Sequence, residues 1–170
     1  ETNHNFPGFD SLSLANHISI SFYWIINKMV NFLPLPLALI FSLLGTINLQ
    51  QKQHRTISIF SLAIAFILLI KFLFRLNCPI YPITSDNILS VVNLLKYLIT
   101  ITSLSIIPYL IVKTNINHKF IYLSLFSFSL ILMFIVTLSP TLDASGSRTI
   151  FLPGMLYLLL GLFLSSETLK

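Results

Sequence analysis

The amino-acid sequence predicts an all-α fold, a polytopic integral membrane bundle of about five transmembrane helices. One observation is a series of long apolar runs separated by short polar loops. Another is composition, because 55% of the residues are hydrophobic and 9% are charged, whereas a soluble domain carries about 25% charged residues. The runs also lack the apolar–polar alternation of a membrane β-barrel. Backbone groups in hydrocarbon must then pair within each segment, so the spans are helices.

The runs divide the chain into a polar tail and five spans within a single membrane domain, residues 1–170. A helix needs about 20 apolar residues to cross the hydrocarbon core, so five spans with short loops use most of the length. The amino-terminal tail covers residues 1–11. The predicted spans are 18–47, 57–74, 88–112, 120–138 and 150–164.

The first span is the least regular. It contains Pro34 and Pro36, which remove two backbone donors and clash with the preceding turn. We predict one span kinked at these two prolines. An alternative places the stretch from Leu12 to Met29 in the membrane interface, with Trp24 at headgroup depth, before a short span. The kinked span is favoured, because residues 34–47 alone are too short to cross.

Particular residues in the later spans indicate where each span begins or ends and where it contacts another helix. The second ends at Lys71 and Arg75, whose long side chains can snorkel to the headgroups. Pro153 opens the fifth at an early helical position, where the missing N–H is tolerated. Small and hydroxylated residues that permit close helix contact occur in the second and fourth spans: Ser58, Ser61, Ala63, Ala65, Ser124, Ser127 and Ser129.

The distribution of basic residues predicts the orientation, since loops rich in Lys and Arg stay inside. Arg75 and Arg148 lie on the opposite side from a larger basic set. The larger set consists of Lys52, Arg55, Lys113, Lys119 and Lys170. We therefore expect the N-terminus outside and the C-terminus inside. The heavy use of Ile, Leu, Phe, Ser and Asn is typical of an AT-rich gene, such as one from an organelle or an AT-rich bacterium. We expect a membrane of a bacterium or organelle, with the inner membrane favoured.

Ionisable residues within spans are functional candidates, because their burial in lipid is unfavourable. Lys28, Lys71 and Lys96 lie in or near predicted spans, and no Asp or Glu lies within a span, which argues against a self-contained proton or sodium pump. Asn93 and Lys96 share a helical face. They predict a polar path or an anion-binding point between helices. The alternative is that Lys96 snorkels to the outer headgroups.

The loop from Ser139 to Thr149 is the other chemical candidate. Asp143 could act as a base or metal ligand, and Arg148 could hold a phosphate or carboxylate with its fork of donors. The alternative is a solvated hairpin loop whose hydroxyl and carboxylate groups make turn bonds. With a single cysteine, Cys78, and no histidine pair at ligating spacing, we expect no cofactor and no metal. The basic residues are scattered, so we expect no nucleic-acid partner.

The segment from Ser139 to Leu164, with its SPTxxxSGSRTxFLPG pattern, resembles the late outer loops of multi-span glycosyltransferases that use lipid-linked donors. The resemblance covers about a sixth of the chain. Those enzymes are much longer and carry acidic residues in their first outer loop. Asp10 and Asp86 are the remotely comparable acids here, so no role is transferred to them.

No motif assigns a reaction, and whether the chain is an enzyme stays open at this point. The predicted function is a non-catalytic helical subunit of a larger membrane complex, such as an energy-transducing one. Its expected partners are the lipid bilayer and other membrane subunits. One alternative is a membrane enzyme that acts on a lipid-linked substrate at the outer face through Asp143 and Arg148. The other is a small transporter or channel module in which Asn93 and Lys96 line a path.

Overall fold

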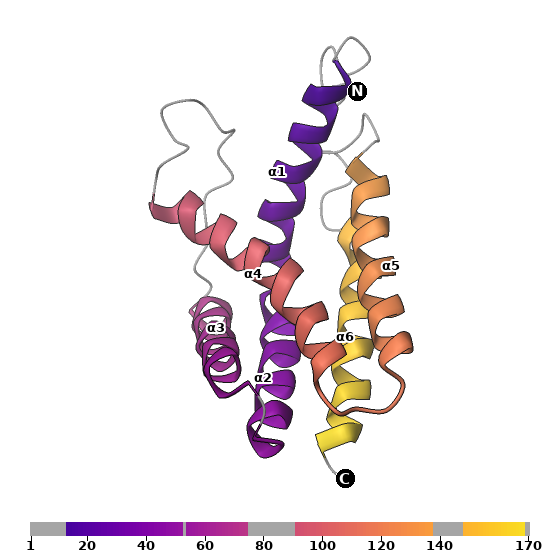
Figure 1. The fold of residues 1–170 in the computed structure, drawn as a ribbon. Coiled ribbons are helices and arrows are strands. Elements are labelled where there is room, and N and C mark those ends of the chain that lie inside the picture. Colours follow the sequence, from indigo (N-terminus) through magenta and orange to yellow (C-terminus); the bar gives the residue numbers. More distant parts are fainter. Residues whose placement is uncertain (1–12, 53, 75–90, 138–147, 169–170) are drawn as a thin grey trace.

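The computed structural model describes residues 13–52, 54–74, 91–137 and 148–168. Six helices and no strand occur in these ranges, which confirms the predicted all-α class. The helices are α1 (Leu14–Phe32), α2 (Pro34–Gln50), α3 (Arg55–Leu73), α4 (Val91–Lys113), α5 (Lys119–Thr137) and α6 (Arg148–Thr168). α1 begins at one end of the molecule and α6 ends at the opposite end (Figure 1).

The chain is a multi-pass membrane protein by the length and composition of these helices. Within the described residues, three are long and apolar enough to cross a membrane: Arg55–Leu73, Leu94–Lys113 and Ile150–Thr168. The bent pair α1–α2 raises the number to four if it counts as one span. The predicted fourth span corresponds to α5, whose apolar part, Lys119–Ile135, is shorter. The helices therefore match the predicted runs, but three or four of them reach membrane length.

The predicted kink at the two prolines is a break between two helices. Leu33 alone separates α1 from α2, and the two axes meet at 77°. Pro34 occupies the first turn of α2, where its missing N–H has no helical partner to lose. Pro36 removes a second donor, so a continuous helix cannot form here. The buried side chain of Leu33 anchors the break in the core.

α2 is the centre of the bundle, and most of its residues are buried. Along one side it packs against α3, where the Ser61 hydroxyl donates to the Phe41 carbonyl at 2.9 Å. The two helices lie close together at Gly45, where a Cβ atom would lie 3.1 Å from the Ser58 carbonyl oxygen. Because a backbone atom moves aside less easily than a side chain, this tight contact favours glycine. Ser58, Ser61 and Ala65 are buried as expected, whereas Ala63 is exposed.

α6 packs against both α2 and α5. Gly161 lets α6 approach Leu39 of α2. On the other side, the Ser129 hydroxyl of α5 donates to the Pro153 carbonyl at 3.1 Å. α6 begins at Arg148, before the predicted start at 150, so Pro153 lies inside the helix rather than in its first turn. The other two hydroxyls predicted to face helices, those of Ser124 and Ser127, are exposed.

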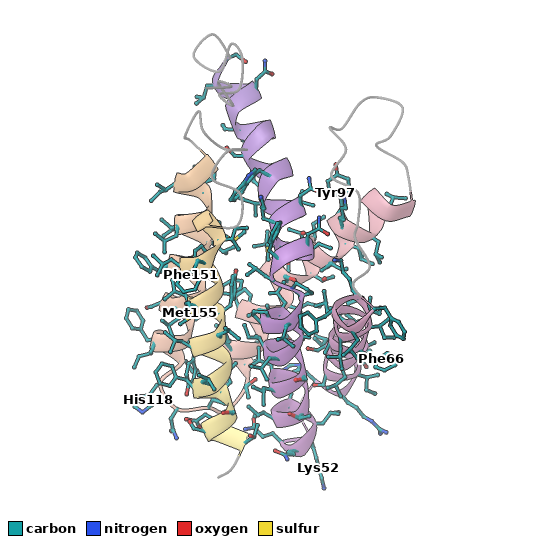
Figure 2. The ribbon with its side chains drawn as sticks, turned by 180° about the vertical axis from the view of Figure 1, so that it is seen from behind. Lys52, Phe66, Tyr97, His118, Phe151 and Met155 are labelled. Carbon is teal, nitrogen blue, oxygen red and sulfur yellow. The ribbon has the colours of Figure 1, made fainter. Side chains whose placement is uncertain are left out.

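α4 crosses the bundle obliquely (Figure 1). It contacts α1, α2, α3 and α5 along its length, so it closes one side of the molecule. Large apolar side chains point outward from the other helices. Phe66 of α3 and Phe151 and Met155 of α6 are directed away from the bundle (Figure 2). In a membrane protein this surface faces lipid or the helices of a partner.

Candidate functional site

Lys96 is the most deeply buried charged group of the described residues. Its side chain is 2% exposed, and its Nζ donates to Oδ1 of Asn27 at 2.9 Å. The bond joins the second turn of α4 to α1. A lysine that snorkelled to the headgroups would be exposed along its end, whereas this one ends between two helices.

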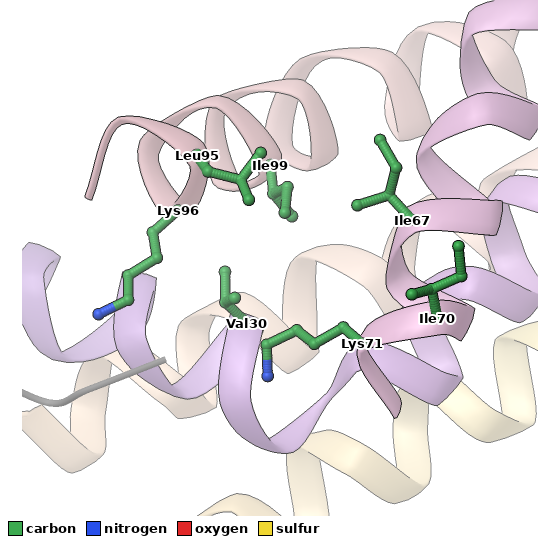
Figure 3. A pocket seen from close by; sticks show the side chains of 7 residues that line it. All are labelled: Val30, Ile67, Ile70, Lys71, Leu95, Lys96 and Ile99. Carbon is green, nitrogen blue, oxygen red and sulfur yellow. The ribbon is translucent and has the colours of Figure 1, made fainter. Parts of the chain in front are cut away.

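The described helices enclose a cavity beside Lys96. It has a volume of about 210 Å³, and it lies between α1, α3 and α4. Figure 3 shows the stems of Lys71 and Lys96 beside the aliphatic side chains, with the nitrogen ends of both lysines pointing away from these side chains. The lining residues are Val30, Ile67, Ile70, Lys71, Leu95, Lys96 and Ile99. The lining is therefore almost wholly apolar, and the two lysines contribute their aliphatic stems to it.

The third lysine near the spans, Lys28, has a different environment. Its Nζ lies 5.2 Å from the ring centre of Trp24 and 4.6 Å from that of Phe32. Attraction between a cation and the face of an aromatic ring stabilises a charge where water is scarce. Each of the three lysines thus contacts particular side chains of the helical bundle.

Buried polar atoms continue along α1 and α4 near the Asn27–Lys96 bond. Thr100 lies one turn after Lys96 on the same helix and is 3% exposed. Within the described part of the chain, neither the Thr100 hydroxyl nor the Nε1 of Trp24 has a hydrogen-bond partner. Trp24 lies one turn before Asn27 in α1. A buried polar atom without a partner is unfavourable in hydrocarbon, so these two atoms mark places where a water or ligand atom would be stabilised.

The other predicted site residues fall at or beyond the limits of the described chain. Asn93 lies in the first turn of α4 and Arg148 is the first residue of α6, but the side chains of both are outside the described part. Asp143 is outside the described residues altogether. Among the residues that are described, no group of three or more His, Cys, Asp or Glu side chains could hold a metal ion.

The opposite end of the molecule is held by polar bonds between three segments, which we call the tied end: Asn48, Gln51, Thr114, Asn115 and Glu167. Gln51 makes two bonds to the backbone of Asn115, donating to its carbonyl at 3.0 Å and accepting from its N–H at 2.9 Å. The buried amide of Asn48 donates to the Thr114 hydroxyl. Glu167 accepts from the Tyr122 hydroxyl at 3.2 Å. These bonds join the end of α2 and the turn after it to the α4–α5 connector, and they join α5 to the end of α6.

Sequence reasoning missed Asn27 and the cavity. Asn27 is a polar residue within an apolar run, and such residues are candidates for a functional site. Its partner, Lys96, lies 69 positions away in the sequence, so the sequence does not show that the two side chains meet. Helical periodicity shows that Lys96 and Thr100 share a face, but not which helix lies opposite that face. Comparison with known proteins adds no assignment, because no family model, no curated protein and no solved structure matches this chain.

Proposed function

We propose that this chain is a non-catalytic helical subunit of a larger membrane assembly, such as an energy-transducing complex. The observation that carries this proposal is the use of the polar side chains inside the helices. Ser61, Ser129 and Lys96 each donate a hydrogen bond to another helix of the same chain. Such bonds stabilise helix association in lipid. Polar groups used in this way support a scaffold rather than a reaction centre.

The proposal includes a topology of five spans in one membrane domain, with the α1–α2 pair as the first span and α5 as the fourth. The N-terminus lies outside and the C-terminus inside, in an inner membrane of a bacterium or organelle. Support comes from the tied end, whose turns carry Lys52, Arg55, Lys113 and Lys119. A cluster of basic turns at one end of a bundle is typical of the inner side.

The surface that supports an assembly is the outward face of α3. This helix packs mainly against α2, and its other face is apolar. Phe66 is 63% exposed and Leu73 is 65% exposed. The rest of this face includes Ile59, Phe60 and Ile67. Aromatic and branched side chains on a helix that is largely open give partner helices a surface to pack against.

The experiment places a photoreactive amino acid at Phe66 in the full chain, expressed in its native membrane. A matched variant carries the same group at Phe151 of α6, which is 69% exposed. We expect the Phe66 variant to give a covalent product with one polypeptide of defined mass. Crosslinks to lipid alone at both positions, with the purified protein running as a stable monomer, would contradict the subunit proposal.

A second function, a small transporter or channel module, is supported by the buried polar atoms around Asn27 and Lys96. The Thr100 hydroxyl and the Trp24 Nε1 have no partner among the described residues, so water or an ion could occupy this region. The test is anion flux through vesicles that contain the purified protein, compared between the wild type and Lys96→Leu. Flux that is equal in the two proteins removes the support for this function.

A further inference from the structure

We propose that three basic residues at the tied end, Lys52, Arg55 and Lys113, bind the phosphates of anionic phospholipids in the adjoining leaflet. We call these three residues the basic patch. This inference goes beyond the subunit role, and it does not depend on which side of the membrane the tied end faces. It stands on the contacts that gather the three residues, on their charge and on the apolar side chains beside them.

Two contacts between segments that are distant in the sequence bring the basic patch together. Gln51 bonds to the backbone of Asn115 at 2.9 and 3.0 Å. Close to this pair, the Nδ1 of His54 lies 3.3 Å from the Tyr109 hydroxyl, and the two rings meet edge to face. Lys113 lies between the two contact points on its segment, and the other two members of the patch are sequence neighbours of the contact points on the α2–α3 turn. The fold therefore holds the three cations near one another.

The basic patch is an excess of positive charge on the surface of the described part of the chain. All three side chains are exposed, and Lys52 points outward from this end of the bundle (Figure 2). Within the described residues the acidic side chain is Glu167, which accepts from the Tyr122 hydroxyl at 3.2 Å, between α5 and α6. Lys119 is not a member of the patch, because its Nζ donates to the Val112 carbonyl at 2.8 Å.

The basic patch lies where the surface of the bundle changes from polar to apolar. Val112, beside Lys113, is 50% exposed, and Phe120 in the first turn of α5 is 83% exposed. Tyr109 is partly exposed, and its hydroxyl lies at His54. Tyrosine is enriched at the interface between membrane and water, and Lys and Arg next to apolar surface place their charged ends among the headgroups. The patch is therefore at the depth of the lipid phosphates.

The chemistry of the basic patch matches a phospholipid with a negative headgroup. Arginine can bond two phosphate oxygens with its planar fork, and lysine contacts phosphate as a point charge with three donors. Basic residues beside transmembrane helices attract anionic lipids. A phospholipid covers both parts of this surface, because its phosphate and its acyl chains are joined. An acidic peptide would cover the basic part alone.

The test measures lipid binding by native mass spectrometry of the full chain in detergent. The probes are phosphatidylglycerol and phosphatidylcholine with identical acyl chains. We expect the wild type to bind phosphatidylglycerol more tightly than phosphatidylcholine. Each of Lys52→Gln, Arg55→Gln and Lys113→Gln should weaken the binding of phosphatidylglycerol by about fivefold, the effect of one basic residue near an anionic membrane surface. The binding of phosphatidylcholine should not change.

Two controls separate the charge of the basic patch from other effects of substitution. Lys52→Arg and Lys113→Arg keep the charge, so they should bind phosphatidylglycerol as the wild type does. Arg75→Gln removes a basic residue that follows the other end of α3 in the sequence, and it should leave the binding unchanged. The thermal midpoint of each variant in detergent shows that the fold is kept.

Three results would overturn the proposal. One is equal affinity of the wild type for the two lipids. Another is the same loss of phosphatidylglycerol binding in Lys113→Gln and Arg75→Gln. The third comes from a photoreactive amino acid placed at Lys113 in the native membrane. A covalent product with an acidic polypeptide, and none with lipid, would assign the basic patch to a partner protein.

Discussion

Two regions of the bundle, the tied end and the surroundings of the cavity beside the α1–α2 break, use polar residues in different ways. At the tied end, uncharged amides bond to the backbone and to hydroxyls of other segments, as Gln51 does with Asn115. Beside the α1–α2 break, a charged group, Lys96, is buried next to a cavity of about 210 Å³. The comparison indicates that the tied end holds the chain together, whereas the region beside the α1–α2 break has room for a ligand.

The largest expected effect concerns the α2–α3 contact that leads into the tied end. Gly45→Val should lower the free energy of unfolding by roughly 3 kcal/mol, because the added atoms meet the Ser58 carbonyl and cannot be accommodated by rotation of a side chain. The control is Gly154→Ala, whose Cβ meets the end of the Leu33 side chain. Reversible unfolding in mixed detergent measures both. Equal effects of the two variants would mean that the Gly45 contact is not rigid.

The next effect concerns the buried lysine. Asn27→Leu should lower the free energy of unfolding by about 2 kcal/mol, since hydrogen bonds to charged groups contribute about 1.5–3 kcal/mol. The double variant Asn27→Leu/Lys96→Met should recover most of the loss, because it removes the charge together with its acceptor. The same unfolding assay gives the coupling between the two positions. Additive losses in the double variant would show that the bond is not coupled.

A smaller effect is expected at the tied end itself. Gln51→Ala removes two bonds to Asn115, and we expect a loss of about 1 kcal/mol, because Gln51 is partly open to water. Gln50→Ala is the neighbouring control, at an exposed helical position. Hydrogen exchange of the Asn115 amide should rise in the first variant and stay unchanged in the second. If hydrogen exchange at Asn115 were unchanged in both variants, the two Gln51 bonds would not stabilise the tied end.

The smallest effect is expected where α6 joins the tied end. Tyr122→Phe removes the hydroxyl that donates to Glu167 and should destabilise the protein by about 0.5 kcal/mol, the usual size of one side-chain bond between membrane helices. The thermal midpoint in detergent would fall by a small amount. If the thermal midpoint fell as much as it does in Gly45→Val, the bond between Tyr122 and Glu167 would stabilise the tied end far more than we expect.

Most of the helices were predictable from the sequence, because each apolar run is long enough to specify its own backbone pairing. α3 (Arg55–Leu73) follows the predicted 57–74 closely. The break near Pro34 and Pro36 was predictable for the same local reason. The 77° angle was not, because it depends on how α2 packs between α3 and α6, and those helices are distant in the sequence.

The candidate site was predictable only in part. The sequence pointed to Lys96 because a charge inside an apolar run is rare. It could not supply Asn27 as its partner, because hydrophobic runs specify helices but not their neighbours. The aliphatic side chains around the cavity, such as Val30 and Ile67, are indistinguishable in the sequence from those that face lipid. Their roles follow from the arrangement of three helices in space.

The central place of α2 has a consequence for the order in which the chain folds during its synthesis. α3 follows α2 after a short turn, so this pair can form as soon as both helices are in the membrane. α6 follows α2 by roughly 100 residues, which at about 5–20 residues per second amounts to about 5–20 s of translation. During that interval the face of α2 around Leu39 lacks the surface of Gly161 that later covers it. A nascent chain halted before α6 therefore exposes this face to lipid and to the insertion machinery.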